Sequence, residues 1–195
     1  MEQELAGRTA FVSGSTQGIG YAIAAALLRE GASVVINGRS EERVETAAAS
    51  LRAEVPGADV GGIPADFGDA AQVDRLTEAL AGTDILVNNV GVFELKEFAE
   101  ISDAEWARYV DVNLMSGVRS ARAALPGMLE RGWGRILFVA SESGVDVPAD
   151  MIHYGVTKAA TIALGNGLAK LTRGTGVTVN SILGGPTYAH GVAET

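Results

Sequence analysis

The most constraining feature of this sequence is a regular alternation of short apolar, β-branched runs with longer helix-like segments. The apolar runs predict strands at residues 9–13, 33–37, 60–64, 84–88, 135–140 and 177–182. They are apolar on both faces, as strands are when helices cover both sides of a sheet. Helices are predicted near 19–30, 41–54, 69–81, 103–131 and 154–173. Because parallel strands need right-handed crossovers, this order predicts an α/β fold, a doubly wound parallel sheet with helices on both faces, in one domain over residues 1–195.

Composition and charge exclude several kinds of protein. The formal net charge of −9 argues against a general nucleic-acid surface, which needs clustered Lys and Arg. The chain has no cysteine, and neither of its two histidines pairs with a carboxylate at metal-ligand spacing, so no metal site is expected. The acidic start lacks the character of a signal peptide, and no apolar run approaches the ~20 residues of a membrane span. We therefore expect a cytoplasmic protein with no membrane partner.

A glycine-rich loop joins the first predicted strand to the first helix. It reads Ser13-Gly14-Ser15-Thr16-Gln17-Gly18-Ile19-Gly20. Gly14 permits a tight turn, while Gly18 and Gly20 would let a pyrophosphate and a neighbouring strand approach closely, with the helix N-terminus facing the phosphates. The spacing is G-x-x-x-G-x-G and no Lys-Ser or Lys-Thr pair closes it, which disfavours a P-loop nucleotidase. The same loop is also compatible with an ordinary glycine-rich turn that binds nothing.

The residues after the second and third strands bear on which dinucleotide would bind. A carboxylate after the second strand would bind the ribose 2′-hydroxyl of NAD and repel a 2′-phosphate. Here Arg39 follows instead, and its guanidinium can bind a phosphate in a bidentate manner, which favours NADP with NAD as a possibility. A solvated surface arginine is the alternative. Asp66 could accept from the adenine amino group or cap a helix, and Asn88 and Asn89 could pack against the adenosine or form a turn.

Tyr154 and Lys158 are four residues apart in a predicted helix, so their side chains share one face. An adjacent ammonium favours the phenolate of a tyrosine, and Tyr154 could then donate a proton to a carbonyl oxygen as a hydride arrives, or remove it in reverse. Ser141 ends the fifth strand and could hold the substrate oxygen. Asn113 is unfavourable inside a helix, which indicates a contact with water or backbone. The alternative for the Tyr-Lys pair is an exposed pair without chemistry.

Taken together, these residues resemble those of the short-chain dehydrogenases/reductases, in the same order and spacing. The matching set is Gly14-x-x-x-Gly18-Ile19-Gly20, Asn88-Asn89-x-Gly91, Asn113, Ser141 and Tyr154-x-x-x-Lys158. The resemblance covers the chain from about Leu5 onward and extends to the 3-oxoacyl-carrier-protein reductase-like branch. It implies a Rossmann fold and an NAD(P)-dependent oxidoreductase. Such an enzyme transfers a hydride between nicotinamide and a carbonyl or secondary alcohol, with Tyr154 as general acid/base and Asn113, Ser141 and Lys158 as the other catalytic residues.

The resemblance also implies a cofactor-binding set and an assembly. The set comprises Gly14, Ser15, Gln17, Gly18, Ile19, Gly20, Arg39, Asp66, Asn88, Tyr154, Lys158 and Thr187. Lys158 would hydrogen-bond the nicotinamide ribose, Asn113 would hold a water that links Lys158 to a proton relay, and Thr187 would reach the carboxamide. Family members pair the helices that correspond to 103–131 and 154–173 between subunits, which implies a homodimer or homotetramer.

Several positions depart from the family pattern. Gln17 stands where NADP-preferring relatives often have a basic residue, which leaves Arg39 as the main phosphate partner. Gly184 stands where a proline is expected, and this change should loosen its loop. Family members usually continue through a substrate-covering helix and a seventh strand, whereas the sequence ends at Thr195, so we expect weakened cofactor affinity and turnover from this chain alone. These departures keep an alternative open, a catalytically impaired dinucleotide-binding or scaffold protein.

The segment 142–152, between the fifth strand and the last predicted helix, is expected to line the substrate cleft. Val145 and Val147 suggest a partly apolar pocket, and Asp146 disfavours a strongly anionic ligand. Simple packing explains the same valines equally well. His153 is interpreted as a helix-start residue without a catalytic role.

Overall fold

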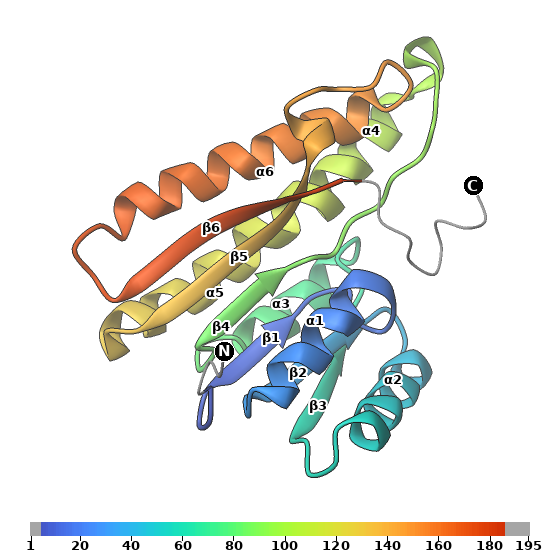
Figure 1. The fold of residues 1–195 in the computed structure, drawn as a ribbon. Helices are drawn as coiled ribbons and strands as arrows, with labels where there is room; N and C mark the ends of the chain where they lie inside the picture. Colours follow the sequence, from blue (N-terminus) through green and yellow to red (C-terminus); the bar gives the residue numbers. More distant parts are fainter. Residues whose placement is uncertain (1–4, 186–195) are drawn as a thin grey trace.

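The computed structural model of the chain describes residues 5–185 and contains one parallel sheet. Its strands are β1 (Thr9–Val12), β2 (Ser33–Gly38), β3 (Val60–Pro64), β4 (Ile85–Asn88), β5 (Gly134–Ser141) and β6 (Val177–Gly184). Their order across the sheet is β3-β2-β1-β4-β5-β6, and every neighbouring pair is parallel. Figure 1 shows the sheet with β3 and β6 at its edges. The predicted doubly wound α/β fold is confirmed.

The helices lie on both faces of this sheet (Figure 1). They are α1 (Gly18–Arg29), α2 (Glu41–Glu54), α3 (Ala70–Glu78), α4 (Asp103–Tyr109), α5 (Ser116–Arg131) and α6 (Ile152–Leu171), with 3₁₀ turns at Phe98–Glu100 and Glu142–Gly144. Within residues 5–185, no helix is both long and apolar enough to cross a membrane.

Two hydrophobic clusters, one on each face, hold the layers together. Alternate residues of β1 serve opposite clusters, because side chains along a strand alternate between the two faces. Ala10 and Val12 pack in the cluster that contains the buried residues of α1 and α2. Phe11 packs in the other cluster with residues of α3 and α5, against which Leu164 of α6 lies. This arrangement explains why the strands are apolar along their whole length.

The single helix predicted over residues 103–131 is wrong in one respect. The helix begins at α4 and ends with α5, but Val110–Met115 between them is π-helical. A π-helical turn inserts an extra residue, which changes the direction of the side chains that follow, and it occurs frequently at functional sites. Asn113 lies in this turn. Its poor fit to a regular helix therefore has a structural counterpart.

The order of the strands fixes where a ligand can bind. From β1 the chain proceeds outward through β2 to β3, and then returns to place β4 on the other side of β1. The loops after β1 and β4 therefore diverge to opposite faces at the carboxyl ends of the two strands. In open α/β sheets, ligands bind in the crevice at this reversal of strand order.

Candidate active site

The glycine loop that follows β1 has a backbone that other residues would not tolerate well. Gly14 and Gly18 have φ angles of +59° and +60°, in the left-handed region that favours glycine. A Cβ atom on Gly20 would lie 2.4 Å from the backbone oxygen of Gly14. The first two glycines shape the turn, and Gly20 lets α1 pack against it.

The strands on either side of β1 brace this loop through two asparagines. Asn37 at the end of β2 accepts a hydrogen bond from the backbone N–H of Gly14 at 3.1 Å. Asn89, just after β4, donates from Nδ2 to the backbone oxygens of Ser13 and Gly14, both at 3.0 Å. The loop is therefore held in one conformation without a ligand, which lowers the entropic cost of binding one.

The side chain of Ser15 points into the protein and helps to hold the glycine loop in place. Its side chain is fully buried, and its hydroxyl donates to the oxygen of Val12 at 2.6 Å and accepts from the N–H of Asn37 at 2.9 Å. Its own N–H donates to the oxygen of Asn37 at 2.8 Å. Both polar donors of Ser15 have partners inside the protein, and its predicted contact with a cofactor stays a prediction.

A groove of about 700 Å³ opens beside the glycine loop, across the point where strand order reverses. Among the residues predicted to bind a cofactor, those that line it are Gly14, Gln17, Gly18, Ile19, Arg39 and Asp66. Asp66 accepts from the N–H of Gly68 at 2.8 Å, and the helix that follows is capped instead by Asp69. Thr16 of the quoted glycine loop also lines the groove, and sequence reasoning missed Arg43 and Arg108, which line it too. No motif marked them, because they depend on how separate segments meet.

Tyr154 and Lys158 lie near the start of α6, on the side that faces β5. Lys158 is only 5 % exposed, and its Nζ donates to the backbone oxygen of Val139 at 2.8 Å. The same Nζ lies 5.5 Å from the centroid of the Tyr154 ring. Tyr154 also shares a hydrogen bond with Ser141 at the end of β5. The three predicted catalytic side chains are thus brought together at the carboxyl end of the sheet.

Burial dominates the electrostatics of this pair. It lowers the pKa of Lys158 to about 8, because the buried ammonium is poorly solvated. It also raises the pKa of Tyr154 above its usual value, while the hydrogen bond with Ser141 acts in the opposite direction. The expectation that the Lys158 ammonium favours the phenolate of Tyr154 stays a prediction, because burial outweighs the lowering effect of Ser141 here. The cost of burying the phenolate exceeds what its neighbours supply.

Asn113 joins the loop after β4 to α6. Its Oδ1 accepts from the N–H of Val92 at 2.8 Å, and its Nδ2 donates to the oxygen of Val92 at 2.9 Å and to Oγ1 of Thr157 at 3.1 Å. The expected backbone contact is confirmed. A Cβ atom on Gly91 would lie 3.5 Å from Oδ1 of Asn113 and 3.6 Å from Nζ of Lys158. Gly91 also lines the groove, so the groove reaches this cluster.

Two other predicted cofactor residues are placed differently. Asn88 is buried, and neither of its side-chain polar atoms has a hydrogen-bond partner within the described residues. It does not line the groove, so its contact with a cofactor stays a prediction. Thr187 lies outside the described residues.

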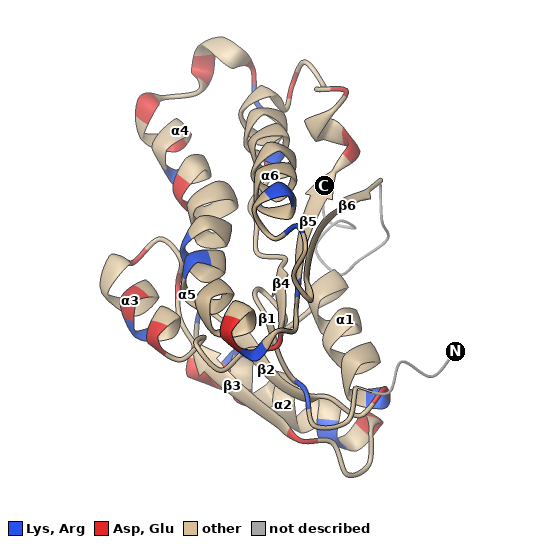
Figure 2. Ribbon diagram, turned by 90° about the vertical axis from the view of Figure 1, so that its left-hand side faces the viewer, with Lys and Arg blue, Asp and Glu red and all other residues tan. Residues whose placement is uncertain are grey.

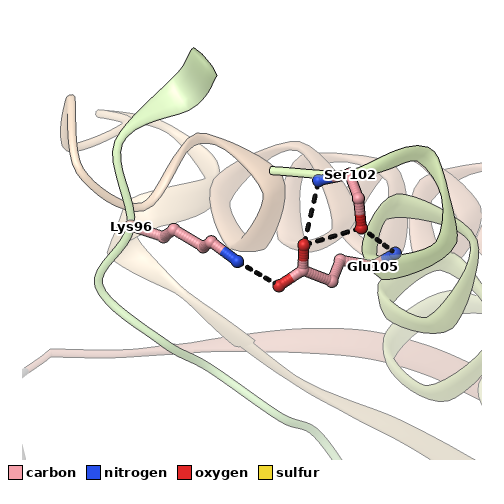
Figure 3. Close-up of polar contacts among 3 residues, drawn as sticks. All are labelled: Lys96, Ser102 and Glu105. Atoms are coloured by element: carbon pink, nitrogen blue, oxygen red, sulfur yellow. Dashed lines mark hydrogen bonds and ion pairs between the residues drawn. The ribbon is translucent and has the colours of Figure 1, made fainter. Parts of the chain in front are cut away.

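The loop after β4 forms one side of the site and is fastened at Lys96. The ammonium of Lys96 pairs with Glu105, whose carboxylate also accepts from the N–H of Ser102 at 2.9 Å and from its hydroxyl at 2.7 Å (Figure 3). Lys96 and these hydrogen bonds lower the pKa of Glu105 to about 2. The N–H of Lys96 donates to the oxygen of Asp150, across the site, at 2.7 Å. The two loops that flank the tyrosine are therefore tied together.

An aromatic ring from the loop after β4 packs against the tyrosine. Phe93, from the fastened loop, is 46 % exposed, and its ring centroid lies 6.2 Å from that of Tyr154 in an edge-on arrangement. His153 points the other way, into the protein, and its ring lies 4.0 Å from that of Tyr109. This placement agrees with a structural role for His153.

Comparisons with known proteins agree with this geometry. Residues 8–195 match the family model described as short chain dehydrogenase. The chain is 45 % identical to the uncharacterized oxidoreductase YvrD of Bacillus subtilis (strain 168), over 100 % of this chain and 74 % of YvrD. It resembles the crystal structure of L-sorbose reductase from Gluconobacter frateurii in complex with NADPH and L-sorbose, at a TM-score of 0.88 and 35 % identity, over 94 % and 71 % of the two chains. It also resembles a single-residue variant of the actinorhodin polyketide ketoreductase with NADPH, at a TM-score of 0.89 and 32 % identity, over 100 % and 76 %.

Proposed function

This chain belongs to the short-chain dehydrogenase family, and from that premise we propose that it is an NADP-preferring oxidoreductase that interconverts a carbonyl compound and a secondary alcohol. The observation that carries the proposal is the meeting of Tyr154, Lys158 and Ser141 at the carboxyl end of the sheet, where Lys158 lies next to Gly91 on the wall of the groove. A serine nucleophile is a poorer interpretation, because no G-x-S-x-G sequence surrounds Ser141.

The groove fits a nicotinamide dinucleotide. Its volume of about 700 Å³ lies in the range of small-molecule and cofactor sites. The braced glycine loop leads directly into α1, whose first N–H groups have no partners within the helix and favour phosphate oxygens. When bound, the dinucleotide supplies or accepts the hydride. Gly14, Gln17, Gly18, Ile19, Arg39 and Asp66 would hold it.

The residues of the chain itself manage the proton. In the direction of reduction, the hydroxyl of Tyr154 donates its proton to the substrate oxygen as that oxygen gains charge, and Ser141 hydrogen-bonds the same oxygen. The resulting phenolate is stabilised by the ammonium of Lys158, its nearest fixed positive charge on α6. The charged residues of α6 are Lys158 and Lys170, and Figure 2 shows blue on this helix, so no carboxylate on it opposes the effect. Because burial raises the pKa of Tyr154, the protonated form is ready for reduction at neutral pH.

A preference for NADP is supported by the residues after β2. Gly38 ends the strand without a carboxylate, and the guanidinium of Arg39 reaches the groove. A 2′-phosphate would meet a positive charge there, and no acidic side chain would bind the free 2′-hydroxyl. Two structural neighbours were crystallised with NADPH.

The proposal also includes assembly through the long helices. Val110 and Leu129 around α5 and Val156 and Leu171 on α6 are exposed apolar residues on the helices that relatives of this family would pair. A homodimer or homotetramer would cover them. Sedimentation of the purified chain measures this directly, and a monomer at all concentrations would contradict it.

The test of the proposed function is a comparison of the natural chain with Tyr154→Phe. NADPH oxidation, followed by absorbance, is measured across a panel of ketoses, aliphatic ketones and aryl ketones. We expect turnover with at least one class, and at least a 100-fold loss in Tyr154→Phe with NADPH binding retained, since general acid catalysis contributes roughly 10²–10⁴-fold. Tight NADPH binding without turnover on any ketone would favour the scaffold alternative instead.

A further inference from the structure

A second arginine lies beside Arg39 on the wall of the groove. Arg43, one helical turn further along in α2, lines both the main groove and a neighbouring hollow of about 390 Å³. The two hollows share Thr16, Gln17 and Arg43. The side chains of Arg39 and Arg43 are exposed, and within residues 5–185 neither guanidinium makes a hydrogen bond or an ion pair. Two uncommitted guanidinium groups therefore border the same part of the groove.

The two carboxylates that line the main groove, Asp66 and Asp69, are already engaged in their own loops, and Glu42 lines only the neighbouring hollow. Asp69 accepts from the N–H groups of Ala71 and Gln72 at 3.0 and 3.2 Å, and from the side-chain amide of Gln72 at 2.8 Å. Asp66 accepts from the N–H of Gly68. In a chain with a net charge of −9, this corner of the groove keeps two free positive charges. An anion of high charge density fits it better than a neutral hydroxyl.

Gly38, at the end of β2 next to Arg39, leaves little room for an acidic side chain. A Cβ atom on Gly38 would lie 2.4 Å from Cγ2 of Thr16 and 3.3 Å from Cγ2 of Val44. An acidic residue at the end of β2, where it would bind the ribose 2′-hydroxyl, would therefore force Thr16 to move. Gly38 itself carries no charge, and Thr16 opposes a larger side chain at this position.

We propose that Arg43 is a second determinant of specificity for the cofactor and binds the ribose 2′-phosphate together with Arg39. This inference rests on the proposed use of NADP and adds a residue that no sequence motif marks. Arg39 and Arg43 approach the phosphate from different backbone positions, a loop and a helix. The dianion would thus be shared between two guanidinium groups, each of which can make two hydrogen bonds to phosphate oxygens.

The test compares two small ligands that differ only in the 2′-phosphate, adenosine 2′,5′-bisphosphate and adenosine 5′-monophosphate. Their dissociation constants are measured by calorimetry for the natural chain, Arg43→Ala and Arg39→Ala. Arg173→Ala is the matched control, because Arg173 follows α6, does not line the groove and carries the same charge. A hydrogen bond to a charged group contributes about 1.5–3 kcal/mol, so the preference for the bisphosphate should fall about 10- to 100-fold in Arg43→Ala. It should stay within about twofold in Arg173→Ala, and Arg43→Lys should restore part of it.

Three other results would contradict either the role of Arg43 or the preference for NADP. If Arg43→Ala keeps the natural preference while Arg39→Ala loses it, Arg39 acts alone and the inference is wrong. If Arg43→Ala weakens both ligands equally, Arg43 supports the adenosine or the fold and not the phosphate. If the natural chain itself does not prefer the bisphosphate, then both the role of Arg43 and the NADP preference fall. The chemistry of Tyr154 would remain testable with NADH in that case.

Discussion

At the scale of single residues, the buried ammonium of Lys158 is unfavourable for the stability of the fold. Lys158 is buried, and its one hydrogen bond to Val139 does not restore the solvation that its ammonium has lost, which is why its pKa falls to about 8. A shift of this size from 10.5 corresponds to about 3 kcal/mol of unfavourable burial at neutral pH. The removal of the group would also free the oxygen of Val139, at a cost of about 1–3 kcal/mol. The two terms are similar in size, so Lys158 adds little to stability.

We therefore predict that Lys158→Met abolishes turnover but leaves the free energy of unfolding at pH 7 unchanged or higher. The pH dependence follows from linkage. Between pH 8 and 10.5 the unfolded chain binds the lysine proton and the folded chain does not, so the contribution of Lys158 becomes more favourable as pH rises. Any excess in the free energy of unfolding of Lys158→Met over the natural chain should therefore decrease between pH 8 and 10.5. Urea unfolding at several pH values measures it, with Lys170→Met, an exposed lysine at the end of the same helix, as control. A loss of more than about 2 kcal/mol in Lys158→Met at pH 7 would contradict the argument.

At the scale of elements, the strands and most helices could be predicted from the sequence. The strand boundaries agree within two residues because continuous β-branched runs define them. The break between α4 and α5 could not be predicted, since one extra residue in a π-helical turn leaves the apolar spacing almost intact. In the site, Tyr154 and Ser141 could be placed because they lie on or at the end of regular elements. The role of Arg43 could not, because it depends on the shape of a groove between separate loops.

The contact between α4 and α6 should make stability depend on pH. His153 is 1 % exposed, its Nδ1 has no partner among the described residues, and burial lowers its pKa from 6.5. Glu94 and Glu105 act against this shift, and Lys96 adds to it. The unfolded chain takes up this proton near pH 6.5 and the folded chain only at lower pH, so stability is lost as pH falls below 6.5.

His153→Phe keeps an aromatic ring against Tyr109 and removes the titrating group. We predict that the variant equals the natural chain within about 1 kcal/mol at pH 7.5, and that it exceeds the natural chain progressively between pH 6.5 and 5. Urea unfolding of both proteins at matched pH gives the difference directly. Parallel loss of stability in the two proteins would show that His153 is not responsible.

At the scale of the whole molecule, the groove joins parts of the chain that meet only when the sheet is complete. Its walls come from the loops after β1, β2, β3 and β4, and Gly91 on its wall lies next to Lys158 of α6. A ligand bound here contacts both halves of the sheet. The unfolded chain has no such groove and would not bind the ligand. Cofactor affinity therefore reports on the integrity of the entire fold, and not only on the glycine loop.

We accordingly predict that NADPH raises the thermal stability of the chain as a whole. At a free concentration 100-fold above its dissociation constant, the gain is about 2.7 kcal/mol, which corresponds to a rise in Tm of roughly 5–10 °C for a chain of this size. NADH at the same concentration should give a smaller rise, because Arg39 and Arg43 would lack their phosphate. Tyr154→Phe should keep most of the shift, since the variant keeps the aromatic ring and removes only the hydroxyl. Equal shifts with NADPH and NADH would remove the NADP preference, and no shift at saturating NADPH would leave the groove without its proposed ligand.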